Sequence, residues 1–373
     1  MKNVSEIPLQ QTKAWEKLQQ DLHETTFFLS ENAKSTSSPR KNSNTTSASS
    51  ENSDTTSTQN QNQKTTIPPS VNYQMLIIKK STPLGPYFYL PYGPYISQKT
   101  AGKSAYNAIL ALAEHENAIF IRIEPKMPEN AAYWLERAKK SKDLSPKETW
   151  ILDLTPPLET LYRDMKQNTR NLARNYPKKG LTVKKVAKTP ENCQILYHFL
   201  QTVAKNNHFN HIEEKTLLAE INQPFSSLYI AYLDLSKIAP DSTPLKTANT
   251  ENPSKTSKIP IAASLFFDTE KTRFYMQSGT DPDYHKFPAT LAILSEAIKD
   301  AKAKNLENFD FWGIAPENAK KNHPWAGFTK FKKSFGGTEV DYAGTHDIIL
   351  KPAKYRLYHL FRQLNLLKRK IFH

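Results

Sequence analysis

Three consecutive residues, Phe331, Lys332 and Lys333, could place a cation beside a reacting group. They lie in a short stretch bounded by glycines, which predicts a short helix. A fixed ammonium can stabilise the oxyanion that forms when a nucleophile attacks an ester carbonyl, and it also binds phosphates. The alternative is that Phe328, Phe331 and Phe335 form a core stripe, with the lysines on its solvated side. Both readings can hold together, because a core stripe would fix the position of Lys332.

A second candidate is Glu124, which ends an apolar strand and precedes Pro125. Proline disfavours a helical conformation of the preceding residue, so the carboxylate is expected on an extended segment. There it could orient or deprotonate an attacking amine. The alternative is a solvated strand-end acid, or one paired with Arg122.

Positive charge is concentrated in two segments. Residues 161–188 and 351–373 together account for the whole net charge of +15, and the rest of the chain is neutral. This distribution suits a polyanionic partner such as RNA, a nucleotide-sugar pyrophosphate or an anionic membrane, although two solvated helix faces would look the same. We expect the segments to form one contiguous positive surface. The candidate RNA contacts are Lys166, Arg170, Arg174 and Lys333.

The alternation of helices and strands predicts two mixed α/β domains. The first covers residues 1–155 and is completed by 347–373, and the second covers 156–346. Two insertions interrupt them: 31–70, which we expect to be disordered because Ser, Thr, Asn and Gln dominate it, and the flexible segment 234–258. A basic helix is predicted over residues 161–175.

Several classes of site are missing from the sequence. A single cysteine, Cys193, and scattered histidines predict no metal site, and no glycine-rich loop suits a nucleotide cofactor or coenzyme A. We therefore expect no cofactor, and an acyl donor other than coenzyme A. The first residues lack the apolar stretch of a secretory signal, and no run is long enough to span a bilayer, which predicts a cytoplasmic protein.

Six motifs in order resemble those of the Fem family of peptidoglycan-bridge peptidyltransferases. The match covers nearly the whole chain outside the insertions. The motifs are Leu9-Gln10 with Trp15, Leu90-Pro91-Tyr92-Gly93-Pro94, Arg122-Ile123-Glu124-Pro125, Leu161-Tyr162 through Thr169-Arg170, Pro260-Ile261-Ala262 with Tyr275 and Gly279, and Phe309-Asp310-Phe311-Trp312-Gly313 followed by 323–337.

This resemblance implies two tandem acyltransferase domains of the GNAT-like fold. It also implies transfer of an amino acid from aminoacyl-tRNA to a side-chain amine of a peptidoglycan precursor, either nucleotide-linked or lipid-linked. In the family, the lysine that follows the phenylalanine of this motif is assigned the catalytic role, which maps to Lys332 next to Phe331, and an Asp or Glu usually stands at the position of the third candidate catalytic residue, Glu124. No heptad hairpin is present, so the chain resembles members without a coiled-coil arm.

The resemblance further implies precursor contacts at Lys17, His211 and Tyr275. Gln19 stands nearer the family's lysine position than Lys17 does, and His211 replaces an arginine. We expect a monomer whose basic C-terminal helix, from Pro352, either packs on the first domain or contacts the inner face of an anionic membrane.

Two other functions compete with this one. A non-enzymatic RNA-binding or regulatory protein could use the same double scaffold, and a GNAT-like N-acyltransferase could use a different acyl carrier. The intact Phe331-Lys332 pair argues against loss of activity.

Overall fold

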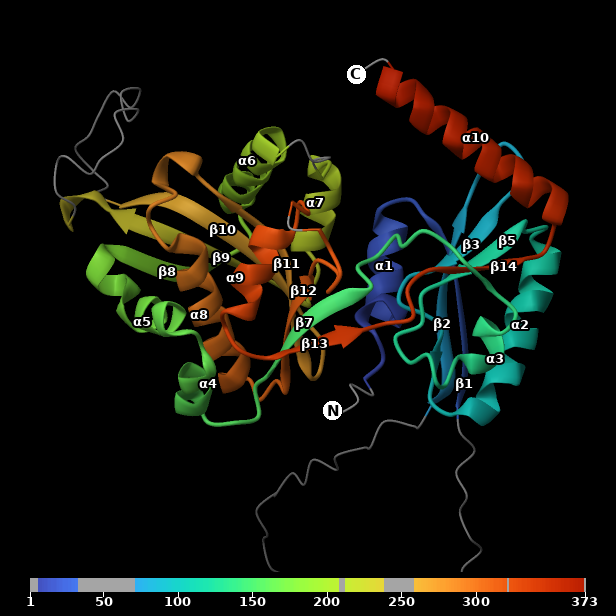
Figure 1. Cartoon of the computed structure of the whole chain (residues 1–373), viewed down its shortest axis with the longest axis horizontal. Helices are drawn as coiled ribbons and strands as arrows, with labels where there is room; N and C mark the ends of the chain where they lie inside the picture. The colour runs from blue at the N-terminus through green and yellow to red at the C-terminus, as the bar shows by residue number, and fades with distance from the viewer. Residues whose placement is uncertain (1–5, 33–70, 208–211, 238–257, 321, 372–373) are drawn as a thin grey trace, which may run out of the picture.

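Two mixed β-sheets of seven strands each organise the described part of the chain in this computed structural model (Figure 1). The structure describes residues 6–32, 71–207, 212–237, 258–320 and 322–371. The central parts of both predicted insertions, residues 33–70 and 238–257, lie outside the described residues, as does His211. No described helix is long and apolar enough to cross a membrane.

The first sheet has the strand order β1-β2-β3-β5-β14-β6, with β4 paired to β2. Helix α2 covers it with the short helix α3, and together they bury a core that includes Phe88, Ile109 and Trp134. The strands are β1 (Thr25–Asn32), β2 (Val71–Lys80), β3 (Tyr87–Leu90), β4 (Tyr95–Ile96), β5 (Phe120–Ile123), β6 (Lys139–Lys140) and β14 (His346–Ile349), and the helices are α1 (Lys13–Asp21), α2 (Gly102–His115) and α3 (Ala132–Leu135).

The second sheet has the order β13-β7-β12-β11-β10-β9-β8. Its strands are β7 (Glu148–Asp153), β8 (Leu181–Val186), β9 (Ser226–Asp234), β10 (Lys258–Asp268), β11 (Thr272–Thr280), β12 (Asn308–Gly313) and β13 (Thr338–Asp341). Its helices are α4 (Leu158–Asp164), α5 (Gln167–Asn175), α6 (Pro190–Asn207), α7 (Glu214–Ile221), α8 (Ala289–Ala303) and α9 (Ala326–Lys333).

Each face of the second sheet buries its own core. Residues of α4, α5 and α8 pack on one face around Phe309 and Phe311. The other face packs on α6 and α7, and it also receives Leu9 and Trp15 from the N-terminal segment. Residues on neighbouring positions of β12 therefore face different surroundings, as the period of two in a strand requires.

The chain crosses from one sheet to the other twice. The first crossing comes before β7 and therefore earlier in the chain than the predicted domain boundary. β7 was assigned to the first domain by the boundary after residue 155, but it pairs with β12 and β13 in the second sheet. Near residue 347 the chain returns to the first sheet, where β14 pairs with β5. A fully buried ion pair between Arg122 and Asp347, at 2.7 Å, holds these two strands together. Arg122 therefore does not pair with Glu124.

The predicted basic helix over 161–175 is two helices. Met165 and Lys166 are extended between α4 and α5, and the Lys166 N–H donates to the Ser334 carbonyl at 2.9 Å. Residues 132–135 form the short helix α3, and the chain then pairs with β14 through β6. Gly180 is left-handed at a helix end, with a φ of 76° that glycine adopts without strain.

The C-terminal helix α10 (Pro352–Ile371) packs on the first sheet, as one of the two alternatives predicted. In Figure 1 α5 lies at one end of the molecule and α10 at the other. The prediction of a single positive surface is therefore wrong. The two basic segments lie on different sheets, because the apolar residues of each segment pack into the core of a different sheet.

Removal of residues 35–66 is expected to leave the melting temperature nearly unchanged. β1 and β2 are antiparallel partners from Thr25 opposite Lys79 to Asn32 opposite Val71, so a short Gly/Ser turn can join them. Closing a shorter loop changes the entropy little. We expect a shift of less than about 2 °C by calorimetry. A large decrease would show that the removed segment supports the first sheet.

Candidate functional site

Lys332 projects from α9 toward the end of β12. Phe331 and Phe335 anchor the helix: their rings lie 5.5 Å apart, and Phe335 packs on Phe311 at 5.3 Å. The Lys332 ammonium donates to the Gly313 carbonyl at 2.6 Å and lies 3.5 Å from the Trp312 carbonyl. Burial lowers the pKa of Lys332 to about 8, against the opposing effect of Asp310. This is an ammonium that can donate a proton near neutral pH.

Asp310 is the buried anion beside this lysine. It accepts hydrogen bonds from the Thr149 hydroxyl and from the Trp312 N–H at 2.7 Å. Burial raises the pKa of Asp310, while Lys126 and Lys332 act in the opposite direction. Trp312 has a φ of 66°, which is uncommon for a residue with a side chain and occurs where the β7–β12 pairing shifts register.

A second lysine, Lys126, faces the same carboxylate from the first half of the chain. Its ammonium lies over three aromatic rings, 4.8 Å from Tyr92, 5.0 Å from Tyr342 and 5.2 Å from Phe274. Burial lowers the pKa of Lys126, and Asp310 partly offsets this. Among the described residues, no hydrogen-bond acceptor is within reach of its ammonium, so the rings stabilise the charge by cation–π interactions.

The rings join the two halves of the molecule at this cluster. Tyr92 follows β3, and its ring contacts that of Trp312 at 5.3 Å. The Tyr92 hydroxyl donates to the Pro146 carbonyl at 3.1 Å, in the segment that passes between the sheets. A Cβ on Gly313 would lie 2.7 Å from the Pro146 side chain, so glycine lets this segment approach β12. We call Lys126, Asp310 and Lys332 the lysine–aspartate cluster.

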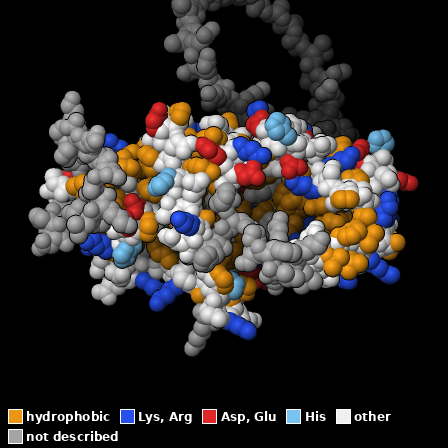
Figure 2. Space-filling view, turned by 90° about the horizontal axis from the view of Figure 1, so that it is seen from above, with side chains coloured by type: hydrophobic (Ala, Val, Ile, Leu, Met, Phe, Trp, Pro, Cys, Tyr) orange, Lys and Arg blue, Asp and Glu red, His pale blue; other side chains and the backbone are white. Residues whose placement is uncertain are grey.

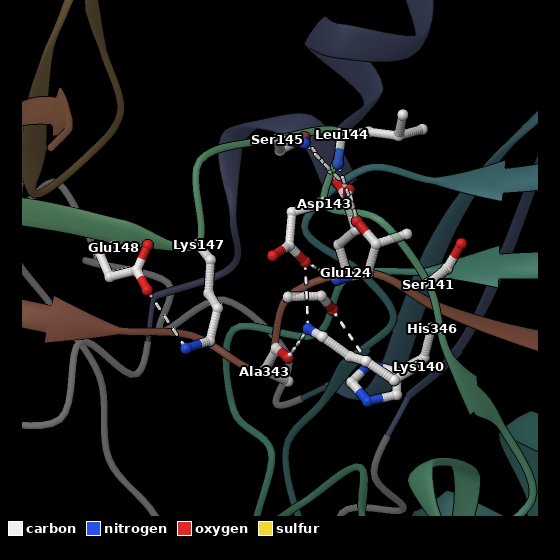
Figure 3. A network of polar contacts seen from close by, with 12 residues as sticks. Glu124, Lys140, Ser141, Asp143, Leu144, Ser145, Lys147, Glu148, Ala343 and His346 are labelled. Carbon is white, nitrogen blue, oxygen red and sulfur yellow. Dashed lines mark hydrogen bonds and ion pairs between the residues drawn. The ribbon is translucent and has the colours of Figure 1, made fainter. Parts of the chain in front are cut away.

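Glu124 is fully occupied by hydrogen bonds. Its carboxylate accepts from the Ser145 N–H at 3.1 Å, the Ser145 hydroxyl at 2.6 Å, the Thr345 hydroxyl at 2.6 Å and the Tyr89 hydroxyl at 2.8 Å. Figure 3 shows Glu124 between the 141–145 segment and the returning chain. Four donors fill the positions at which a carboxylate accepts hydrogen bonds, which favours a role in holding the two inter-sheet passages.

Replacement of Glu124 by glutamine separates this holding role from catalysis. The amide can accept at one oxygen only, so buried hydroxyls lose their acceptor and the free energy of unfolding is expected to fall by about 2 kcal/mol. Chemical denaturation measures this loss. A variant with unchanged stability and strongly reduced turnover would instead identify Glu124 as the base.

A cavity of about 590 Å³ lies on the other side of α9. Lys166 and Lys330 contribute cations to its wall, Phe331 contributes an aromatic ring, and the first residues of α8 close one end. Tyr284, His285 and Phe287 also line it. Because Phe331 lines this cavity and Lys332 faces Asp310, α9 presents the predicted catalytic pair to two different spaces.

The other predicted site residues are dispersed. Lys17 is exposed on α1, 3.6 Å from Asp21. Tyr275 lies on the face of β11 opposite that of Phe274, stacked on Phe266 at 5.6 Å, where burial raises the pKa of Tyr275 to about 12. The structure does not bring Tyr275 to the lysine–aspartate cluster.

The predicted RNA contacts differ in whether their side chains are already bound to another group of the protein. Lys166 opens into the cavity. Arg170 donates to the Arg163 carbonyl at 3.0 Å, and Arg174 is paired with Glu159. Lys333 pairs with Glu339 at 3.0 Å and lies over the Trp150 ring.

Sequence reasoning missed Lys126 and did not assign a role to Asp310. Lys126 follows the Arg122–Pro125 motif directly, and Asp310 lies in an otherwise apolar strand. A charged residue inside a buried strand was the available signal, since such a residue is rarely buried without a partner. Of the described residues, no three His, Cys, Asp or Glu side chains form a group that could hold a metal ion.

Comparison with known proteins matches this chain to a protein family, to curated relatives and to solved structures. Residues 235–363 match the model of the FemAB family. Aminoacyltransferase FemA of Staphylococcus epidermidis is 26% identical over 113 residues, a match that covers 30% of this chain and 26% of that relative. The chain thus spans about a quarter of the length of the curated relatives that it matches.

The crystal structure of FemX superposes with a TM-score of 0.71 at 15% identity, covering 95% of this chain and 96% of that one. The structure of L-PGS from Bacillus licheniformis gives a TM-score of 0.50 at 12% identity, over 75% of this chain and 84% of that one. The two mixed sheets and the match to FemX confirm the predicted fold of mixed α/β sheets.

Proposed function

Because residues 235–363 match the model of the FemAB family, we propose that the chain is an aminoacyltransferase that adds an amino acid to an amine of a peptidoglycan precursor. The donor in this proposal is aminoacyl-tRNA, and the reaction takes place in the cytoplasm. The acceptor is the side-chain amine of the stem peptide. The protein acts as a monomer.

The lysine–aspartate cluster is the observation that carries this proposal. The ammonium groups of two half-buried lysines face one fully buried carboxylate, Asp310, so the cluster has an excess of positive charge at a partly desolvated position. Such a site favours a species whose negative charge develops during the reaction. An ester carbonyl that is attacked by an amine forms such a species.

The chemistry of the transfer assigns a role to Lys332. The acceptor nitrogen forms a bond to the ester carbonyl carbon, and the bond from that carbon to the ribose oxygen then breaks. The carbonyl oxygen bears the transient charge, and the proton from the amine ends on the ribose oxygen. Two carbonyls already orient the Lys332 ammonium, which leaves an N–H free for either oxygen.

The acceptor is expected on the side of the cluster formed by Lys126 and the three rings. A precursor carries phosphates and peptide carboxylates, and the Lys126 ammonium retains N–H groups for such an anion. Lys17, exposed on α1, stays our candidate for a phosphate contact farther away.

The donor is expected at the cavity beside α9. Lys166 and Lys330 can neutralise phosphates, the first turn of α8 offers backbone N–H groups to an anion, and Tyr284 and Phe287 can stack on bases. These features suit the single-stranded 3′ end of a tRNA. Phe331 in the cavity wall then lies next to the residue that faces the reacting carbonyl.

Reversal of both cavity charges, Lys166→Glu with Lys330→Glu, is expected to weaken tRNA binding by at least tenfold at physiological salt. The plot of log Kd against log salt should become shallower by about one to two units, because two phosphate contacts are lost. The matched control is Lys99→Glu with Lys103→Glu, two exposed lysines on the first half. Equal effects of both double variants would show that the donor does not bind in this cavity.

The function itself is tested by incubating the protein with charged total tRNA and either a nucleotide-linked or a lipid-linked precursor, then weighing the products. We expect one precursor to gain the mass of an aminoacyl residue. Product formed from an acyl-coenzyme A but not from charged tRNA would favour the N-acyltransferase alternative. Binding of tRNA with no product would favour the regulatory alternative.

A further inference from the structure

Helix α10 has two opposite faces with different surroundings. Tyr355 and Tyr358 pack against the first sheet, with ring distances of 5.2 Å from each to Phe120. The residues on the opposite face are exposed and apolar. They are Leu357 (39% exposed), Leu360 (50%), Phe361 (47%) and Leu364 (44%). Their spacing of i, i+3, i+4 and i+7 places them in one row along the helix.

A basic groove of about 620 Å³ runs beside this row. Lys139, Lys140 and Lys142 form one wall, and Arg356 and Arg362 of α10 contribute to the other. Leu360 lines the groove as well, so the groove and the apolar row are continuous. Figure 2 looks onto this side of the molecule and shows hydrophobic side chains gathered at one end, with Lys and Arg at the border.

Most of these cations have no acidic partner in the described part of the chain. Lys140 pairs with Asp143 at 3.1 Å, whereas no ion pair involves Lys139, Lys142, Arg356 or Arg362. Asp347, a buried acid 4.0 Å from His359 in the groove, is already paired with Arg122. The segment 351–373 contains no acidic residue. The groove therefore presents a net positive charge to an external partner.

We propose that α10 and this groove form a docking surface for a membrane that contains anionic lipids. In this arrangement the row of Leu357, Leu360, Phe361 and Leu364 enters the region between headgroups and acyl chains. The cations of the groove then contact the lipid phosphates. Exposed apolar residues on one helix face, bordered by Lys and Arg, are the pattern of a helix that lies in a membrane interface.

The observations favour a lipid surface over a nucleic acid. A nucleic acid is held by cations together with rings that stack on bases, and it gives no reason for a row of exposed leucines. The tyrosines of α10 are turned inward onto Phe120 and are not available for stacking. This membrane proposal does not depend on the transfer activity, and the two are tested by separate measurements.

The test uses the full chain and sedimentation with vesicles of phosphatidylcholine, with or without 30% phosphatidylglycerol. We expect binding to the anionic vesicles only, and a decrease of that binding at high salt. Leu360→Asp with Phe361→Asp is expected to weaken binding at least tenfold, as is Arg356→Glu with Arg362→Glu. Circular dichroism confirms that the variants are folded.

Two controls accompany these variants. Phe328→Asp changes an equally exposed phenylalanine (46%) on the other half of the molecule, and Lys99→Glu with Lys103→Glu matches the change of net charge. Both should bind vesicles like the unmodified protein. The proposal is overturned if the unmodified protein binds no anionic vesicles or if the controls lose as much binding as the α10 variants. It is also overturned if Arg356→Glu with Arg362→Glu weakens tRNA binding and leaves vesicle binding intact.

Discussion

Replacement of Lys332 by alanine is expected to lower kcat by about 10²–10³-fold, the usual effect of removing one oxyanion-stabilising group. The ammonium of Lys332 is the group that two carbonyls of the β12 end hold in place beside Asp310. The affinity for precursor should change little, because Lys332 acts on a charge that develops during the reaction. Turnover with saturating precursor and charged tRNA measures the effect.

Lys333→Ala is the matched control for this prediction. The neighbouring lysine is paired with Glu339 on the far side of α9, so its loss should change kcat by less than about threefold. Lys332→Arg should restore part of the activity, since a planar guanidinium cannot present the same point charge. Equal, mild effects of both alanine variants would show that the two lysines only form the solvated side of the Phe331 and Phe335 stripe and that Lys332 has no catalytic role.

The arrangement of elements could be predicted from the sequence where one local pattern decided the outcome. Pro352 begins the C-terminal helix, as expected, and the alternation of helices and strands along the chain forms mixed sheets, as predicted. The break at Met165 and Lys166 could not be predicted in this way. It depends on the Ser334 carbonyl, a partner 168 residues away in the sequence that accepts the Lys166 N–H. Local helix propensity gave way there to a tertiary contact.

The candidate site could be predicted only in part for the same reason. The Phe331-Lys332 pair is recognisable because its residues are adjacent. The lysine–aspartate cluster is not, because Lys126 and Asp310 come from different sheets and meet only where Tyr92 and Tyr342 join the two halves. Glu124 shows the converse: a strand-end acid looks available in the sequence, but its acceptor positions are filled by residues that return from distant segments.

Replacement of Asp310 by asparagine is expected to shift the alkaline limit of activity to lower pH. Burial lowers the pKa of Lys332 to about 8, and the Asp310 carboxylate is the group that opposes this effect. Without the carboxylate the pKa of Lys332 should fall further, by about one to two units. The active ammonium is present below its pKa and is lost above it. The variant should therefore lose about five- to fiftyfold of kcat at pH 8 and no more than about twofold at pH 6.

The choice of asparagine keeps the local structure intact, because its side-chain oxygen can still accept from Thr149 and from the Trp312 N–H. A pH profile of kcat from pH 6 to 9 distinguishes an electrostatic effect from a structural one. A structural defect would lower kcat by the same factor at every pH, whereas loss of the Asp310 charge moves the descending limb. Lys332→Arg provides the complementary profile, since a guanidinium stays charged over this range and its residual activity should show no descent near pH 8. A descent at the same pH in Asp310→Asn, Lys332→Arg and the unmodified protein would place the titrating group outside the cluster.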